Sequence, residues 1–116
     1  MEDEPVIVKV LSRTLKADGF EIDTAENGSI AKAKIDSGEK YDLFVFDIRT
    51  PVISGIQLFE HLEKEHREMI EKVIFMTGDS LNTATAQFLQ RINRPYLMKP
   101  FMPSQLQDLV KQTIKT

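Results

Sequence analysis

Hydrophobic and polar positions alternate along the chain between helical and strand-like spacing. Apolar residues recur at helical spacing in the segments 5–17, 56–65, 81–91 and 103–116, which predicts amphipathic helices there. A short helix with a poor apolar stripe is predicted over 29–36. The segment 20–24 alternates apolar and polar residues, as a partly exposed strand does. The runs 43–46, 73–76 and 96–98 are short and mostly apolar, which predicts further strands. Strands alternating with helices favour an α/β fold with a parallel sheet and helices on both faces.

Polar side chains follow three of the predicted strands. Asp47 ends the second, Thr77 follows the third and Lys99 follows the fourth. The carboxyl ends of parallel strands share one edge of the sheet, and ligands bind at that edge. We therefore expect a carboxylate, a hydroxyl and an ammonium group to meet there.

A pair of acidic residues, Glu2 and Asp3, lies just before the first predicted helix. Three carboxylates crowded together repel one another unless a cation neutralises them, and Mg²⁺ suits such an oxygen-rich site. Asp47 would then be placed to attack a phosphoryl donor in line. Lys99 and the metal would balance the charge on the phosphoryl oxygens.

Length, charge and the lack of Cys exclude several classes of protein. The chain has 116 residues with 15 Lys and Arg against 18 Asp and Glu, and it has no Cys. This length predicts one domain over residues 1–116, and the lack of Cys excludes disulfide scaffolds and thiolate metal sites. No stripe of basic residues is available for direct nucleic-acid binding, and no apolar run is long enough to span a membrane. We expect a cytoplasmic protein.

These residues resemble the receiver domain of two-component response regulators, the CheY-like family. The matching positions are the acidic pair Glu2 and Asp3, the phosphoacceptor Asp47, the switch hydroxyl Thr77, the rotating aromatic Tyr96 and the lysine Lys99. The resemblance covers essentially the whole chain. It implies a flavodoxin-like, doubly wound parallel sheet with the strand order 2-1-3-4-5.

The same resemblance implies the ligands of the site. Asp3 and Asp47 would bind Mg²⁺ through their side chains, Arg49 through its backbone carbonyl and Glu2 through a water molecule. Thr77 and the backbone amide of Gly78 would receive the phosphoryl oxygens, one of which would pair with Lys99. Movement of Thr77 and Tyr96 would reshape the face formed by the last two helices and the last strand.

Partners also follow from the resemblance. A histidine kinase or a histidine phosphotransfer protein would donate the phosphoryl group, docking beside the first helix, where Lys9, Arg13 and Lys16 line one face. A downstream effector would read the switched face. The segments around Thr77 and Tyr96 are more similar to receivers attached to hybrid sensor kinases than to those of transcription regulators. Such a domain signals, with at most self-catalysed phosphorylation and dephosphorylation.

Two alternatives stay open at this point. A phosphohydrolase of the haloacid-dehalogenase type also forms an aspartyl phosphate after a parallel strand, but it needs a second Asp two residues later, where this chain has Arg49. A degenerate receiver would act only as a protein-binding module. The charged and hydroxyl positions are all present, which argues against that reading.

Two histidines suggest a metal or a phosphohistidine, but their spacing does not support either. His61 and His66 are five residues apart, so on a continuous helix they would point about 140° away from each other. The pair also lacks the spacing of a zinc-protease motif. We predict that both are solvated surface residues.

The family places a strand before its acidic pair, whereas only Met1 precedes Glu2 here. The domain therefore looks N-terminally truncated relative to the family, with the first strand missing. Removing a central strand would leave a gap of about 9–10 Å between two unpaired edges. Either upstream residues belong to the protein, or the chain rearranges or exchanges strands in an oligomer. We expect the chain as it stands to associate or to bind Mg²⁺ poorly.

Overall fold

The computed structural model describes residues 1–50, 52–78 and 83–114. The elements in chain order are α1 (Pro5–Ala17), α2 (Gly28–Asp36), β1 (Phe44–Asp47), α3 (Gly55–Glu65), the 3-10 helix η1 (Arg67–Lys72), β2 (Val73–Thr77), α4 (Thr83–Ile92), β3 (Tyr96–Met98) and α5 (Pro103–Ile114). All five predicted helices are present. Positions 81, 82, 115 and 116 of the predicted helices lie outside the described residues. The sequence pattern did not predict η1.

The sheet consists of three parallel strands in the order β1-β2-β3. Phe46 of β1 pairs with Phe75 of β2, and Phe75 in turn pairs with Tyr96 of β3. The α/β fold class with a parallel sheet is confirmed. Because all three strands run the same way, their carboxyl ends meet at one edge of the sheet, as predicted.

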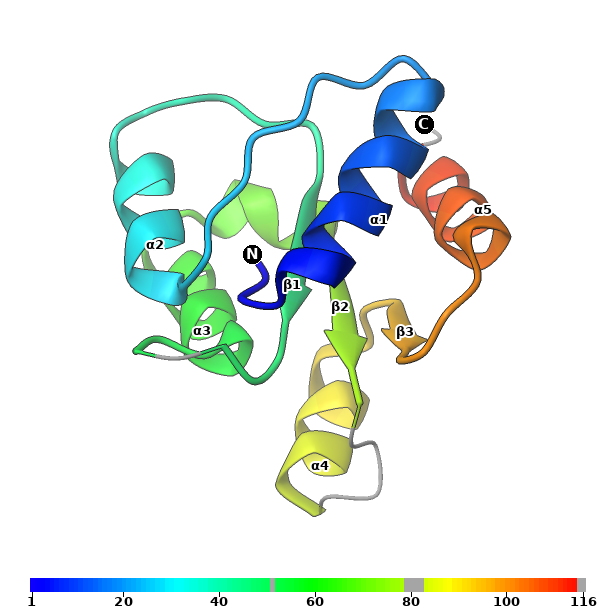
Figure 1. Cartoon of the computed structure of the whole chain (residues 1–116). Helices are drawn as coiled ribbons and strands as arrows, with labels where there is room; N and C mark the ends of the chain where they lie inside the picture. The colour runs from blue at the N-terminus through cyan, green and yellow to red at the C-terminus, as the bar shows by residue number, and fades with distance from the viewer. Residues whose placement is uncertain (51, 79–82, 115–116) are drawn as a thin grey trace.

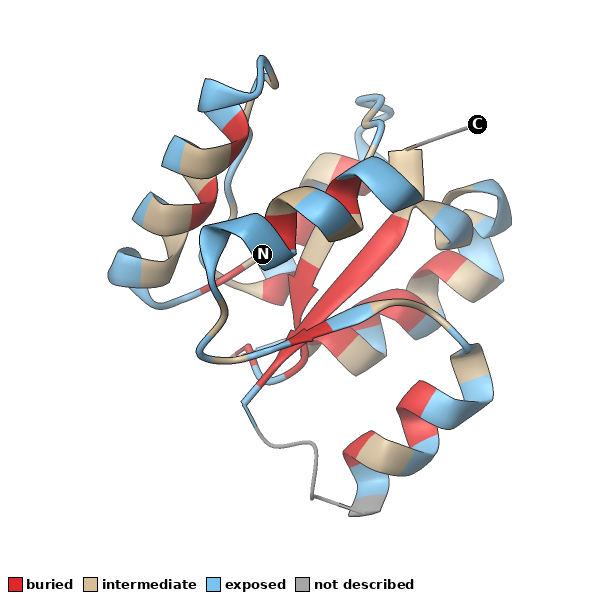
Figure 2. Ribbon diagram, turned by 90° about the vertical axis from the view of Figure 1, so that its right-hand side faces the viewer, coloured by how far each residue is buried: buried red, intermediate tan, exposed pale blue. Residues whose placement is uncertain are grey.

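Helices cover both faces of the sheet, and β2 contributes side chains to both cores. Val73 and Phe75 pack in a cluster that includes residues of α2, α3 and α4, whereas Ile74 and Met76 pack with residues of α1 and α5. Figure 1 shows α1 and α5 on one side of the strands and α2 and α3 on the other. Buried residues gather in the strands and on the inward sides of the helices (Figure 2). The continuous apolar run of β2 is thus explained by burial on both faces.

The loop after β1 is held tightly against the sheet. Ser54 and Gln57 form a reciprocal capping box that starts α3. The backbone amide of Gly55 donates to the carbonyl oxygen of Ile48 at 3.0 Å. A Cβ atom at Gly55 would lie 2.4 Å from the carbonyl oxygen of Asp47, so only glycine permits this approach. The start of α3 therefore fixes the backbone at the end of β1.

The predicted strand over residues 20–24 is wrong, because this segment pairs with no strand in the described structure. A cavity of about 640 Å³ lies between this segment, α1 and β1. The carbonyl oxygen of Thr24 in this segment instead accepts a hydrogen bond from the Lys34 side chain at 2.8 Å. The amide of Glu2 donates to the carbonyl oxygen of Ala25 at 3.0 Å, which links the end of this segment to the first residues of the chain.

The first residue lies beside β1 (Figure 1). The Met1 amino group donates to the carbonyl oxygen of Val45 at 2.6 Å, and the amide of Asp47 donates to the carbonyl of Met1 at 3.0 Å. This is the hydrogen-bond pattern of a parallel strand pair. Burial lowers the pKa of the Met1 amino group to about 6. Within the described part of the chain, no helix has the length and apolar character needed to cross a membrane.

Candidate functional site

Asp47, the last residue of β1, is the centre of the polar edge. It is 5% exposed, and its carboxylate lies where β1 turns toward α3. Its Oδ2 atom is 3.2 Å from Nζ of Lys99, and its Oδ1 atom accepts a long hydrogen bond of 3.5 Å from the amide of Arg49. A buried carboxylate in this position needs a cation beside it.

Glu2 is the second buried carboxylate of the site. Its Oε2 atom accepts hydrogen bonds from the amides of Asp3 and Glu4, at 3.1 and 3.2 Å. Its Oε1 atom lies 2.8 Å from Nζ of Lys99, but it has no hydrogen bond of good geometry among the described residues. This buried oxygen therefore retains capacity for a further donor, such as a water molecule.

Lys99 joins these carboxylates from the loop after β3. Its side chain is 16% exposed, and Nζ contacts Glu2 and Asp47 and lies 3.9 Å from Oε1 of Glu4. Burial by itself lowers the pKa of Lys99, but the close contact of its ammonium group with the carboxylates of Glu2 and Asp47 outweighs burial and raises that pKa. Lys99 therefore stays an ammonium group at neutral pH. The backbone amide of Lys99 also donates to the carbonyl of Thr77 at 2.8 Å, which ties β3 to β2.

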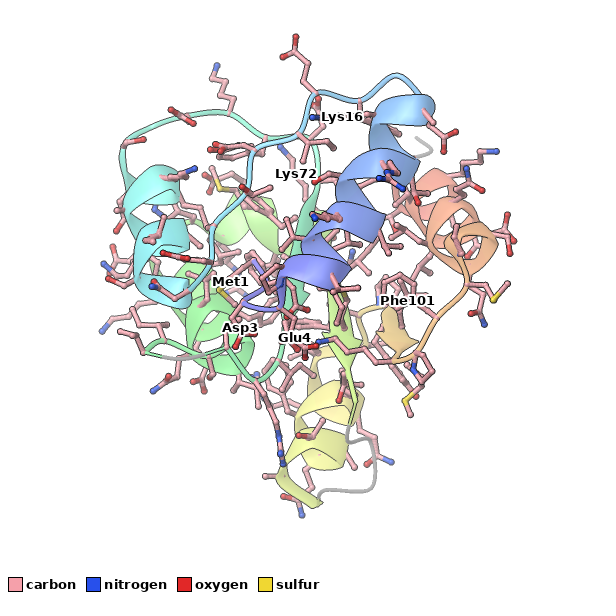
Figure 3. The ribbon with its side chains drawn as sticks, viewed as in Figure 1. Met1, Asp3, Glu4, Lys16, Lys72 and Phe101 are labelled. Carbon is pink, nitrogen blue, oxygen red and sulfur yellow. The ribbon has the colours of Figure 1, made fainter. Side chains whose placement is uncertain are left out.

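Carboxylate oxygens of Glu2, Asp3 and Asp47 all lie within 4.8 Å of one another. Asp3 is exposed, so the cluster opens to solvent on its side (Figure 3). The single ammonium group of Lys99 leaves these three carboxylates with excess negative charge. An oxygen-only donor set of this charge, with one open side for water or phosphate, fits Mg²⁺.

The other predicted residues lie at or near the same edge. Thr77 ends β2 and is buried, and Gly78 follows it at the surface, where a Cβ atom would make only ordinary contact with the side chain of Lys99. Arg49 is exposed beside Asp47. Tyr96 lies farther from the edge, because it pairs with Phe75, two residues before Thr77. The structure thus brings Glu2, Asp3, Asp47 and Lys99 into one cluster, with Tyr96 at a distance along β3.

The expectation that the two histidines point away from each other is wrong, and both are partly buried rather than fully solvated. Nε2 of His61 and Nε2 of His66 each lie 2.8 Å from the same oxygen, Oδ1 of Asp36. The helical geometry behind the prediction does not apply, because α3 ends at Glu65 and His66 has non-helical φ and ψ angles of −141° and 55°. Since Asp36 belongs to a different helix, no local spacing in the sequence could have revealed this cluster.

The fold places the chain in the class of flavodoxin-like α/β domains with a parallel sheet. Within that class, the chain belongs to the response regulator receiver domain family, whose model matches residues 1–111. It is therefore a signalling module of two-component signal transduction rather than a classical enzyme.

Relatives of known sequence and structure support this assignment. The chain is 32% identical over 114 residues to the probable transcriptional regulator ycf29 of Porphyra purpurea, covering 98% of this chain and 54% of ycf29. It is 33% identical to the response regulator TrrA of Thermotoga maritima, solved with Mg²⁺ and BeF, with a TM-score of 0.80 and coverage of 97% and 93% of the two chains.

A third relative is the receiver domain of the sensor histidine kinase PA1611 of Pseudomonas aeruginosa, solved with magnesium in its active site cleft. It is 25% identical, with a TM-score of 0.84 and coverage of 100% of this chain and 94% of that domain. Magnesium is thus bound by receiver domains of this fold. The chain spans about half of the length, or less, of the curated relatives it matches first.

Proposed function

We propose that this receiver domain accepts a phosphoryl group on Asp47 from a phosphohistidine donor, with Mg²⁺ bound beside it. The observation that carries the proposal is the convergence of Glu2, Asp3, Asp47 and Lys99 at the carboxyl edge of the sheet. The match to the receiver family supports the transfer chemistry. The same match argues against the haloacid-dehalogenase alternative. That family also needs a second Asp two residues after the first, where this chain has Arg49.

In the proposed step, a carboxylate oxygen of Asp47 attacks the phosphorus atom of the donor. A bond between phosphorus and this oxygen forms while the bond between phosphorus and the donor imidazole nitrogen breaks, and the imidazole leaves. Lys99 already contacts Oδ2 of Asp47 and would pair with a phosphoryl oxygen. Thr77 and the amide of Gly78 would receive the remaining oxygens.

Glu2, Asp3, Asp47 and the carbonyl of Arg49 would hold the metal, with Glu2 acting through water. The buried Oε1 atom of Glu2, which pairs with Lys99 but lacks a hydrogen bond of good geometry, and the exposed side chain of Asp3 support this assignment. When bound, Mg²⁺ neutralises charge on the transferring phosphoryl group. The self-catalysed loss of the phosphoryl group to water belongs to the same proposal.

The donor would be a histidine kinase or a histidine phosphotransfer protein in the cytoplasm. Two features of α1 support docking beside it: Lys9, Arg13 and Lys16 are all exposed, and Val6 at its start is 73% exposed. Figure 3 shows Asp3 and Glu4 at one end of α1 and Lys16 at the other. An apolar contact near the site with a basic stripe beyond it suits an acidic partner surface.

The output surface would be the face of α4, β3 and α5. Tyr96, Met98 and Met102 are large apolar side chains that are 45%, 44% and 65% exposed. Exposed apolar clusters mark interaction sites more often than isolated residues do. We propose that phosphorylation moves Thr77 and Tyr96 and that an effector reads the change here. The hybrid-kinase context of the domain stays a prediction.

The cavity beside β1 lies where the sequence analysis expects the family's first strand to be missing. It is lined by residues of β1 and by the segment 20–25, which pairs with no strand among the described residues. We propose that an extended strand fills this space, supplied either by residues before Met1 or by exchange with another chain.

The proposal is tested by incubating the protein with acetyl phosphate and Mg²⁺ and measuring its intact mass. We expect a gain of one phosphoryl group that requires Mg²⁺ and is absent in Asp47→Ala. A domain that acts only as a binding module would show no gain. The same gain in Asp47→Ala would contradict the assignment of the acceptor.

A further inference from the structure

A second cluster of metal-ligating side chains lies between α2 and α3, outside the receiver site. Asp36 is the last residue of α2, His61 lies in the last two turns of α3, and His66 directly follows α3. One carboxylate oxygen and the two Nε2 atoms lie within 4.8 Å of one another. The two imidazole rings also contact each other, with centroids 5.5 Å apart.

These side chains are partly withdrawn from water. The side chain of His61 is 18% exposed and that of His66 is 23% exposed. Surface histidines without a partner are usually free to sample many rotamers, whereas here both rings aim the same nitrogen at one oxygen. The cluster is therefore preorganised, which reduces the conformational entropy that a ligand would have to overcome.

The electrostatic setting favours a cation. The cluster lies at the carboxyl ends of both α2 and α3, where the helix dipoles carry partial negative charge. Lys32 binds the other oxygen, Oδ2, at 2.9 Å, and leaves Oδ1 to the histidines.

The geometry is close to that of a tetrahedral metal site. Zinc binds imidazole nitrogen and carboxylate oxygen at about 2.0–2.2 Å, which places neighbouring ligand atoms about 3.4 Å apart. In this structure Oδ1 lies 2.8 Å from each Nε2. An increase of about half an ångström in each of these two distances would make room for the ion. Each neutral ring would then carry its proton on Nδ1.

We propose that Asp36, His61 and His66 bind one Zn²⁺ or a similar divalent transition metal, with water as the fourth ligand. Two imidazoles and one carboxylate match the preference of such metals, and Mg²⁺ prefers the oxygen-only cluster at Glu2 and Asp3 instead. Lys32 supports the site by orienting the carboxylate. The ion would fasten the end of α2 to the end of α3.

Titration of the protein with zinc chloride by calorimetry tests the proposal. We expect one ion per chain, and a loss of affinity of about 100-fold or more in His61→Gln and in His66→Gln, since each removes a ligand. Long-range proton–nitrogen NMR spectra should show the Nε2 signals of both rings shifting on addition of zinc. Magnesium chloride should leave these signals unchanged.

Two control variants separate this site from other carboxylates. Asp23 resembles Asp36 in being an exposed aspartate paired with a lysine, Lys34, but it contacts no histidine among the described residues. Asp23→Asn and Asp47→Ala should both retain the zinc site. Absence of zinc binding in the unaltered protein would overturn the proposal. So would an affinity in either histidine variant equal to that of the unaltered protein, or loss of the site in Asp47→Ala. Circular dichroism establishes that each variant is folded.

Discussion

At the scale of single residues, the receiver site depends on one ammonium group. Lys99 is the cation that lies between the buried carboxylates of Glu2 and Asp47. Removing it would leave two buried negative charges near each other without a partner. Such a loss is costly, because a buried charge without compensation loses its hydration and gains nothing in return.

We predict that Lys99→Met lowers the free energy of unfolding at neutral pH by about 3 kcal/mol in the absence of Mg²⁺. Added Mg²⁺ should restore part of the loss, because the metal replaces the missing positive charge. Urea unfolding with and without Mg²⁺ measures both effects. Lys111→Met, a change at an exposed lysine of α5, serves as the control and should have little effect. A Lys99→Met protein as stable as the unaltered one would contradict the geometry.

The contacts of Asp36 predict how the stability of the fold depends on pH. Its pKa lies well below the ordinary value of 3.8 in the folded protein, chiefly because of the hydrogen bond from His61. A carboxyl with a lowered pKa stabilises the fold above its ordinary pKa and loses that contribution as the pH falls toward the folded value. Stability should therefore decline below about pH 5, and Asp36→Asn should make the decline shallower. The urea concentration at the midpoint of unfolding, measured at several acidic pH values, gives this decline. An equally steep decline in Asp36→Asn and in the unaltered protein would count against the Asp36 contacts.

At the scale of elements, the site relies on the close contact between the start of α3 and the end of β1. Gly55→Ala would place a methyl group 2.4 Å from the carbonyl oxygen of Asp47. We predict a loss of about 2 kcal/mol or more in stability, together with slower phosphorylation, because the backbone of Asp47 must move. Gly78→Ala is the matched control for stability, since its methyl group would lie 3.9 Å from Lys99. Equal stability of the two variants would contradict the contact.

The elements show where sequence reasoning succeeded and where it failed. The predicted strand over residues 73–76 lies within β2, because a run of apolar residues buried on both faces has few alternatives. Residues 20–24 alternate like a strand, but a strand also needs a neighbour, which the local pattern cannot supply. Asp36 and His66 meet across two helix ends, a long-range contact that no spacing encodes. Asp47 and Lys99 were predictable because parallel strands bring their carboxyl ends together.

At the scale of the whole molecule, the cavity beside β1 interrupts the packing of the α1 side of the sheet. It is about 640 Å³ in volume, far above the voids of ordinary protein cores. We predict that this chain associates, or binds Mg²⁺ weakly, because this space lies directly beside the first residues, which carry the site carboxylates. Size-exclusion chromatography with light scattering and Mg²⁺ titration test this. A clean monomer that binds Mg²⁺ at micromolar to low-millimolar concentration would contradict the prediction.

The central claim is that Asp47 carries the phosphoryl group, and locating the modified residue tests it most directly. After treatment with acetyl phosphate and Mg²⁺, borohydride reduces an aspartyl phosphate to homoserine, which changes the mass of the peptide that contains it. We predict that this change maps to Asp47 alone. Reduction at another carboxyl group, such as Asp3, or no reduced peptide despite a phosphoryl mass gain, would contradict the claim.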